Sequence, residues 1–280
     1  MRAATLVLLT ALCSNAQWMH SPTPGIPRTR DGKANLTAAA PRVNGKPDLS
    51  GLWQVEATPF EEITRLFGPG LGTLSVPGDD LRTFSKYAIS VLADFKQEEA
   101  PMRPEAAKIT LDRLKTGGTS NPTTQCLPGS VPFGGLLPFP SKFVQSPREI
   151  VVMQEGDGGL REIFTDGRKH TPDPQPSWMG YSVGRWEGDA MVVDTTGFND
   201  LGWLDGSGHP RSEALKLQER YRRRDFGHMD VQVTIDDPKM YTRAFGFKYV
   251  LDLVPDSEIG EYVCAENEKD RAHFLDRAQR

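Results

Sequence analysis

The sequence predicts a mainly β protein, in which an antiparallel meander of strands closes into a barrel and a small helical insertion lies near the N-terminus. From residue 149 onward, segments that alternate apolar and polar residues follow one another, with Gly and Asp between them. Two of these segments, 181–187 and 190–196, meet at Gly188-Asp189, which is typical of a β-hairpin. A third segment, 213–223, places on one face Leu215, Leu217, Glu219 and Tyr221.

The remaining strands are predicted as short segments in series, separated by turn residues. The expected set is 149–155, 160–165, 181–187, 190–196, 213–223, 228–236, 245–254 and 259–264. Short strands in series with tight turns favour a barrel. Helical spacing of apolar residues predicts a helix over 79–98, and a second helix is expected over 104–115, with Pro104 in its first turn and glycines after its end. The insertion 79–116 is expected to cover one end of the barrel.

The chain of 280 residues divides into four expected parts. Residues 1–16 have a positive end, a short apolar core and a small-x-small cleavage site, which together are typical of a signal peptide. Residues 17–47 predict a disordered or extended arm, 48–270 one barrel domain, and 271–280 a polar tail. We therefore expect a secreted or periplasmic protein. The formal net charge of −4 does not favour a nucleic-acid partner, and no segment is apolar over the length that a membrane span requires.

Two cysteines, Cys126 and Cys264, remain after the expected cleavage. In an oxidising compartment they most simply form one disulfide, which closes a long loop and stabilises the fold. Two free thiols are the alternative. Cys126 lies in a proline-rich loop over 119–147, and a disulfide would hold this loop in place.

No strong catalytic motif occurs in the sequence: the nucleophile elbow, the phosphate-binding loop, the dinucleotide fingerprint and the zinc-protease helix motif are all missing. The candidate catalytic residues are His209 and His170, as general acid or base with Asp205 or Glu219. Because loops two strands apart emerge at the same end of a barrel, the loops holding the two histidines should share one rim. A metal bound by both histidines and a carboxylate is an alternative, but the paired ligand spacing is missing, so no metal and no cofactor is expected.

Glu219 is the one carboxylate on the inward face of its strand. Burying it without a partner costs several kcal/mol or more, so it must be paired, hydrogen-bonded or protonated. If Arg161 or Arg243 reaches it, the pair is structural. If no cation reaches it, its pKa should rise, as a general acid requires.

The Gly51-x-Trp53 motif at the first expected strand resembles the opening of lipocalin-like, calycin-type barrels, and Gly184-Arg185-Trp186 repeats it. A wider set of motifs is similar to a family of secreted bacterial proteins that carries no established activity. This set comprises Cys126-Leu127-Pro128, Asp166-Gly167-Arg168, Trp178-Met179-Gly180, Gly184-Arg185-Trp186-Glu187-Gly188-Asp189, Gly208-His209-Pro210, Thr234-Ile235-Asp236-Asp237-Pro238 and Glu261-Tyr262-Val263-Cys264. The lipocalin-like resemblance concerns the fold and does not by itself imply a function.

Three functions remain open from the sequence. The first is a lipocalin-like protein that binds a small, partly apolar organic ligand at the barrel mouth. The residues expected to contact this ligand are Trp178, Trp203, Trp186, Tyr221 and Tyr241, with His209 at the same mouth. The second is a cofactor-independent hydrolase, lyase or isomerase that uses a histidine–carboxylate pair there. The third is an interaction module of the cell envelope. A carboxylate within hydrogen-bonding reach of a mouth histidine would separate the first two.

Overall fold

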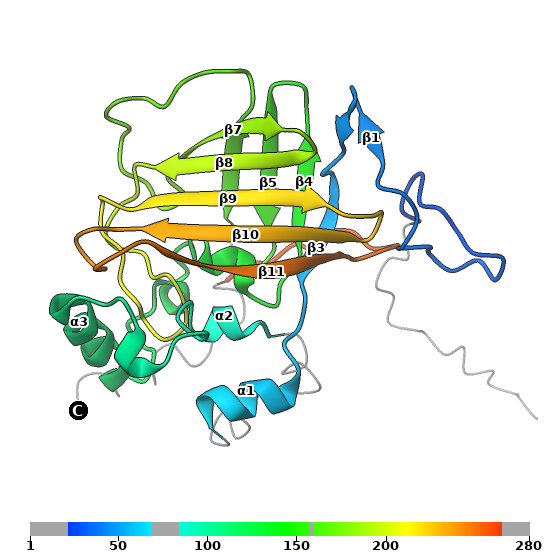
Figure 1. Ribbon diagram of the computed structural model, residues 1–280. Helices are drawn as coiled ribbons and strands as arrows, with labels where there is room; N and C mark the ends of the chain where they lie inside the picture. Colours follow the sequence, from blue (N-terminus) through cyan, green and yellow to red (C-terminus); the bar gives the residue numbers. More distant parts are fainter. Residues whose placement is uncertain (1–21, 69–83, 157–158, 265–280) are drawn as a thin grey trace, which may run out of the picture.

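The computed structural model describes residues 22–68, 84–156 and 159–264, so the expected signal peptide and polar tail lie outside the described residues. Nine strands form a closed barrel, in the order β10-β11-β3-β4-β5-β6-β7-β8-β9 (Figure 1). Their bounds are β3 Gly51–Val55, β4 Ser141–Gln145, β5 Glu149–Gln154, β6 Leu160–Phe164, β7 Tyr181–Glu187, β8 Ala190–Thr196, β9 Lys216–Arg223, β10 His228–Asp236 and β11 Phe245–Leu253. The prediction of a mainly β barrel with a small helical insertion is confirmed.

One strand pair departs from a simple meander. Ile163 of β6 lies opposite Ser182 of β7 in a parallel pairing, whereas the other neighbouring strands of the barrel are antiparallel. Parallel neighbours need a connection that returns along the barrel. Residues 165–180 make this return, and they contain Pro172, Pro174 and Pro176 rather than a tight turn into a partner strand.

The helical part of the chain is smaller than predicted. The helices are α1 Phe60–Phe67, α2 Lys86–Ile89 and α3 Pro104–Lys115, with 3₁₀ helices η3 Gln97–Glu99, η4 Pro122–Gln125 and η5 Phe133–Leu136. The helix expected over 104–115 is confirmed. The continuous helix expected over 79–98 is wrong: 79–83 lie outside the described residues, and only α2 and η3 are helical in the rest. Ser90 ends α2 in an extended conformation, and its hydroxyl accepts a hydrogen bond from the Leu92 amide, which competes with helix formation.

Two further strand predictions need correction. Residues 259–264 form no strand, and β4 lies inside the loop of 119–147 that was expected to be irregular. β4 pairs with both β3 and β5, and therefore closes the wall of the barrel. The helices α1, α2 and α3 lie together on one side of the barrel, beside β11 (Figure 1). Within the three described ranges, every helix is too short or too polar to cross a lipid bilayer.

The described part of the expected arm packs on the barrel at the turn between β9 and β10. The amides of Phe226 and Gly227 in this turn donate hydrogen bonds to the carbonyls of Ala38 and Leu36, respectively, and each bond is 2.7 Å long. A short hairpin of β1 Arg42–Val43 and β2 Lys46–Pro47 follows. We call this end of the barrel the arm end; in Figure 1 it lies toward the blue N-terminal segment.

Trp53 closes the arm end from inside. Its side chain is fully buried, and the Arg223 guanidinium lies 4.8 Å from its ring centroid. Arg223 also donates hydrogen bonds to the backbone carbonyls of Asp48, Ser50 and Phe226. Because burial removes water from the guanidinium, the pKa of Arg223 falls to about 10. The Gly-x-Trp motif therefore serves to close one end of the barrel.

Candidate functional site

The segment before β4 covers the opposite end of the barrel. Residues 129–137, which we call the plug, include η5, and the side chains of Val131, Phe133 and Leu136 are buried. The Ser130 hydroxyl donates a hydrogen bond to the carbonyl of Trp178 over 2.5 Å, and it accepts one from the Arg211 guanidinium. The plug is thus fastened at its first turn to two loops of this end, which we call the plug end.

A cavity of about 20 Å³ lies inside the barrel beneath the plug. Its lining residues are Val131, Pro132, Gly135, Ser141, Phe143, Val152, Gln154, Arg161, Glu219, Tyr221, Tyr249 and Leu251. A space of this size holds about one water molecule. Gly135, Gln154 and Tyr249 are only partly buried, although Tyr249 points inward between Phe247 and Leu251. Solvent therefore reaches part of each of these three lining residues.

A buried ion pair forms the polar side of the inner cavity. Nη2 of Arg161 lies 2.5 Å from Oε2 of Glu219, and the two side chains are only 5% and 3% exposed. The Tyr221 hydroxyl donates to Oε1 of Glu219 over 2.7 Å. Arg161 also donates to the hydroxyls of Ser182 and Thr195, over 3.0 and 2.9 Å. The inward position of Glu219 is confirmed, and its cationic partner is Arg161, so the pair holds the barrel wall together.

Burial and the ion pair set the charge states at the inner cavity. Desolvation lowers the pKa of Arg161, but the attraction of Glu219 outweighs it and the pKa rises above its usual value. Desolvation raises the pKa of Tyr221 and of Tyr249 well above the usual range, because the phenolate would lie in a medium of low polarity near Glu219. Both tyrosine hydroxyls therefore keep their protons at neutral pH.

His209 lies at the plug end in contact with a buried carboxylate. Its Nδ1 lies 2.5 Å from Oδ2 of Asp205, which is fully buried. The same carboxylate accepts hydrogen bonds from the Val91 amide over 2.7 Å and from the His209 amide over 3.2 Å. Asp205 therefore joins the loop of residues 203–210 to the segment after α2. The geometry that an acid–base pair requires is present, and the same contacts also brace two loops.

His170 lies on the outer wall of the barrel instead. Its Nδ1 lies 3.4 Å from the Thr196 hydroxyl, and its ring meets the Tyr181 ring edge-to-face with centroids 6.1 Å apart. These contacts share no residue with those of His209. In the parts of the chain that the structure describes, no group of three or more His, Cys, Asp or Glu side chains is placed to hold a metal ion. Whether one ligand contacts both histidines stays a prediction.

The aromatic residues expected at the mouth lie in different surroundings. Tyr221 borders the inner cavity, whereas Trp203 is buried and its ring lies 4.9 Å from the Arg113 guanidinium. Tyr241 is buried, and its hydroxyl donates to the Pro210 carbonyl over 2.9 Å. Trp186 is partly buried against the core, and Trp178 is partly exposed. A role for these side chains in ligand binding stays a prediction. Sequence reasoning missed Tyr249, Phe143 and the plug itself, which only the closed barrel brings together.

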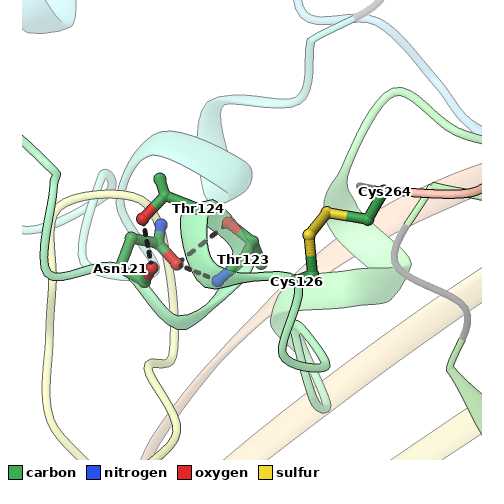
Figure 2. The surroundings of a disulfide bond; sticks show 5 residues. All are labelled: Asn121, Thr123, Thr124, Cys126 and Cys264. Carbon is green, nitrogen blue, oxygen red and sulfur yellow. Dashed lines mark hydrogen bonds between the residues drawn. A yellow bond between two sulfur atoms is a disulfide. The ribbon is translucent and has the colours of Figure 1, made fainter. Parts of the chain in front are cut away.

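The predicted disulfide is present. Cys126 and Cys264 are bonded with their Cα atoms 5.6 Å apart, so the end of η4 is tied to the segment after β11 (Figure 2). The side chain of Asn121 caps η4 by accepting hydrogen bonds from the amide and the hydroxyl of Thr123. This cap and the disulfide fix the chain immediately before the plug.

Comparison of the sequence with protein-family models gives no match, and comparison with curated proteins gives no match either. The closed barrel and its inner cavity are therefore the features that indicate a function.

Proposed function

We propose that this protein binds a small, mostly apolar organic molecule inside its barrel, as the lipocalin-like resemblance of Gly51-x-Trp53 suggests. The observation that carries the proposal is the inner cavity, which has apolar walls and a polar side and lies beneath the plug. Phe143, Val152 and Leu251 supply apolar wall. Binding sites for small molecules combine such walls with a few convergent polar groups.

The charged pair at the cavity supports the same proposal. Desolvating two ions costs several kcal/mol each, and apolar residues of similar volume often stabilise a core as well or better. For stability alone, apolar residues at positions 161 and 219 would serve the barrel as well as this ion pair. A role in ligand binding explains why polar groups stand at this position.

Ligand entry requires the plug to move. The cavity of about 20 Å³ holds one water, whereas sites for drug-sized molecules measure roughly 300–1,000 Å³. The described structure is therefore the closed state, and the apparent affinity is reduced by the fraction of molecules that are closed. We also propose that the protein is exported, because the disulfide fits an oxidising compartment.

The test is titration with N-phenyl-1-naphthylamine, an uncharged apolar probe whose fluorescence rises on leaving water. Val152→Phe fills the inner cavity, and Val151→Phe is its matched control, because neighbouring residues of β5 point to opposite sides of the wall. We expect saturable binding by the wild type and Val151→Phe, and at least tenfold weaker binding by Val152→Phe with an unchanged circular dichroism spectrum.

Equal affinity of Val152→Phe, or no saturable binding by the wild type, overturns the proposal. If Val152→Phe does not fold, Gly135→Leu replaces it. A Cβ atom at Gly135 would meet its nearest atom, Nε2 of Gln154, at an ordinary contact distance of 3.7 Å, so the new side chain enters the cavity without backbone strain.

Acid–base catalysis at His209 is the second candidate function, favoured by the 2.5 Å contact with Asp205. A catalytic imidazole must present Nε2 to its substrate. Diethyl pyrocarbonate acylates accessible imidazole nitrogens, and mass spectrometry locates the product. Modification of His209 at least as fast as that of His228, whose side chain is 27% exposed, supports this candidate. Protection of His209 in the folded protein leaves only the bracing role.

A further inference from the structure

The inner cavity presents hydrogen-bond donors whose acceptors are missing, while its one carboxylate is already engaged. Oε1 of Glu219 accepts from Tyr221, and Oε2 accepts from Arg161. Each oxygen of this carboxylate therefore already accepts one hydrogen bond from the protein itself.

Arg161 and Tyr249 keep donors for a ligand. The bonds of Arg161 to Ser182, Thr195 and Glu219 use Nε and Nη2, and Tyr221 is a further hydrogen-bonding neighbour of the guanidinium. Among the described residues, the enclosed side-chain polar atoms without a partner are only Nε2 of His170 and Nε of Arg211. The Tyr249 hydroxyl, for which no partner is found there, is therefore reached by open space, and Arg161 and Tyr249 both border the inner cavity. Donors left in such a place favour an acceptor atom on the occupant.

The charge at this wall selects an uncharged ligand. Arg161 and Glu219 are in contact, so their charges nearly cancel at the cavity. A ligand carboxylate would lose its hydration near Glu219, and a ligand ammonium would lose its hydration near Arg161. Neither would gain a full counter-charge, and a bare ion is costly to bury. An uncharged acceptor such as a carbonyl oxygen meets the free donors without this cost.

We infer that the ligand is an uncharged, mostly apolar molecule with a carbonyl oxygen, which accepts hydrogen bonds from Arg161 and Tyr249 while the rest lies against Phe143, Val152 and Leu251. This inference rests on the proposed binding function. It assigns the polar end of the ligand, its charge and the two donors, none of which follows from a barrel fold alone.

Three compounds that share one naphthalene ring system and the same number of non-hydrogen atoms test the inference. They are 2-acetylnaphthalene, 2-isopropenylnaphthalene, in which CH₂ replaces the carbonyl oxygen, and 2-naphthoate, each measured by displacement of N-phenyl-1-naphthylamine. Transfer from water favours the alkene, so a preference for the ketone must come from hydrogen bonds. We expect the ketone to bind at least tenfold more tightly than either other compound.

Tyr249→Phe keeps the ring and removes one donor. It should weaken binding of the ketone roughly three- to tenfold and leave binding of the alkene unchanged. Equal affinities of ketone and alkene for the wild type overturn the inferred ligand class while the proposed binding function stands. Tightest binding of 2-naphthoate overturns it in favour of an anion site. If none of the three displaces the probe, the inferred ligand class fails while the proposed binding function stands. If Val152→Phe binds the probe normally, the proposed function fails and the inference fails with it.

Discussion

Replacing Glu219 by Gln tests whether the ion pair inside the barrel holds the fold together. Gln has nearly the shape of Glu but no charge, so Arg161 would remain as a cation that is 5% exposed, without an anion. Breaking a buried pair in this way costs about 3–5 kcal/mol. The hydrogen bond from Tyr221 can persist to the amide oxygen, so the loss of the charge is the main perturbation.

Urea unfolding followed by tryptophan fluorescence, with the disulfide intact, measures the change in the free energy of unfolding. The double variant Arg161→Met/Glu219→Leu removes both charges and keeps the volume apolar. It should recover most of the stability, because such replacements are often neutral or stabilising by about 1–4 kcal/mol. Glu187→Gln is the control: Glu187 pairs with Arg220 and Arg185 on the outer wall, and its side chain is 44% exposed, so its loss should leave the midpoint nearly unchanged.

A free energy of unfolding of Glu219→Gln within about 1 kcal/mol of the wild-type value would contradict a structural role for the ion pair, since surface substitutions have effects of that size or smaller. A double variant that is less stable than Glu219→Gln would contradict this role as well. In that case the surrounding hydroxyls, rather than the mutual attraction of the two charges, would hold each side chain in place.

Three shorter predictions concern other parts of the molecule. In protein that begins after the expected cleavage site, alkylation without reductant should label neither Cys126 nor Cys264, and reduction should lower stability by about 2–5 kcal/mol; labelling of both in folded protein contradicts the disulfide. Gly246→Ala should cost roughly 1–3 kcal/mol in urea unfolding, because its Cβ would lie 2.1 Å from a backbone oxygen of β10, whereas Gly135→Ala has room and should be neutral. Burial raises the pKa of Asp252, so its contribution to stability is present at low pH and lost as pH rises through the folded pKa; Asp252→Asn should remove this loss in an acid-to-neutral series of melting temperatures.

The strands from β5 to β11 were predictable because each is a short segment that alternates apolar and polar residues or runs apolar, and each ends near a Gly or Asp turn. β4 has the alternation too, with Ser141 and Phe143 buried, but the prolines around it suggested a loop. The parallel pairing of β6 with β7 was not predictable, because alternation fixes which face a residue takes and leaves the direction of the partner strand open.

The expected helix over 79–98 failed because helical spacing also occurs in irregular chain that packs on a core. Tyr87, Val91 and Leu92 are all buried against the barrel, yet only the first lies in a helix. The Ser85 hydroxyl caps the start of α2, whereas the Ser90 hydroxyl accepts a hydrogen bond from the Leu92 amide just after α2 ends. Tertiary packing and this local bond at Ser90 replaced the helical ones.

Part of the candidate site followed from the sequence, and part required the closed barrel. Period-two alternation placed Glu219 inside, and a cationic partner was one of three expected ways to accommodate it, beside hydrogen bonds and protonation. The inner cavity, however, is formed by Arg161, Tyr221 and Tyr249 from three strands that are distant in the sequence. The burial of Trp203 could not be predicted either, because the sequence around an aromatic loop residue does not distinguish packing in the core from contact with a ligand.

The two ends of the barrel differ in how completely the hydrogen-bond donors of their buried arginines are satisfied, and we expect this difference to decide where the proposed ligand enters. At the arm end, Arg223 donates to backbone carbonyls through Nε, Nη1 and Nη2. At the plug end, Arg211 is 1% exposed, burial lowers its pKa to about 9, and its Nε has no hydrogen-bond partner among the described residues. An unsatisfied buried donor costs about 1–3 kcal/mol, and opening the plug end would let water reach it. Arg211 also donates a hydrogen bond to Ser130 at the start of the plug. The donor without a partner, Nε of Arg211, therefore belongs to the residue that holds the plug in place. We therefore expect the proposed ligand to enter at the plug end.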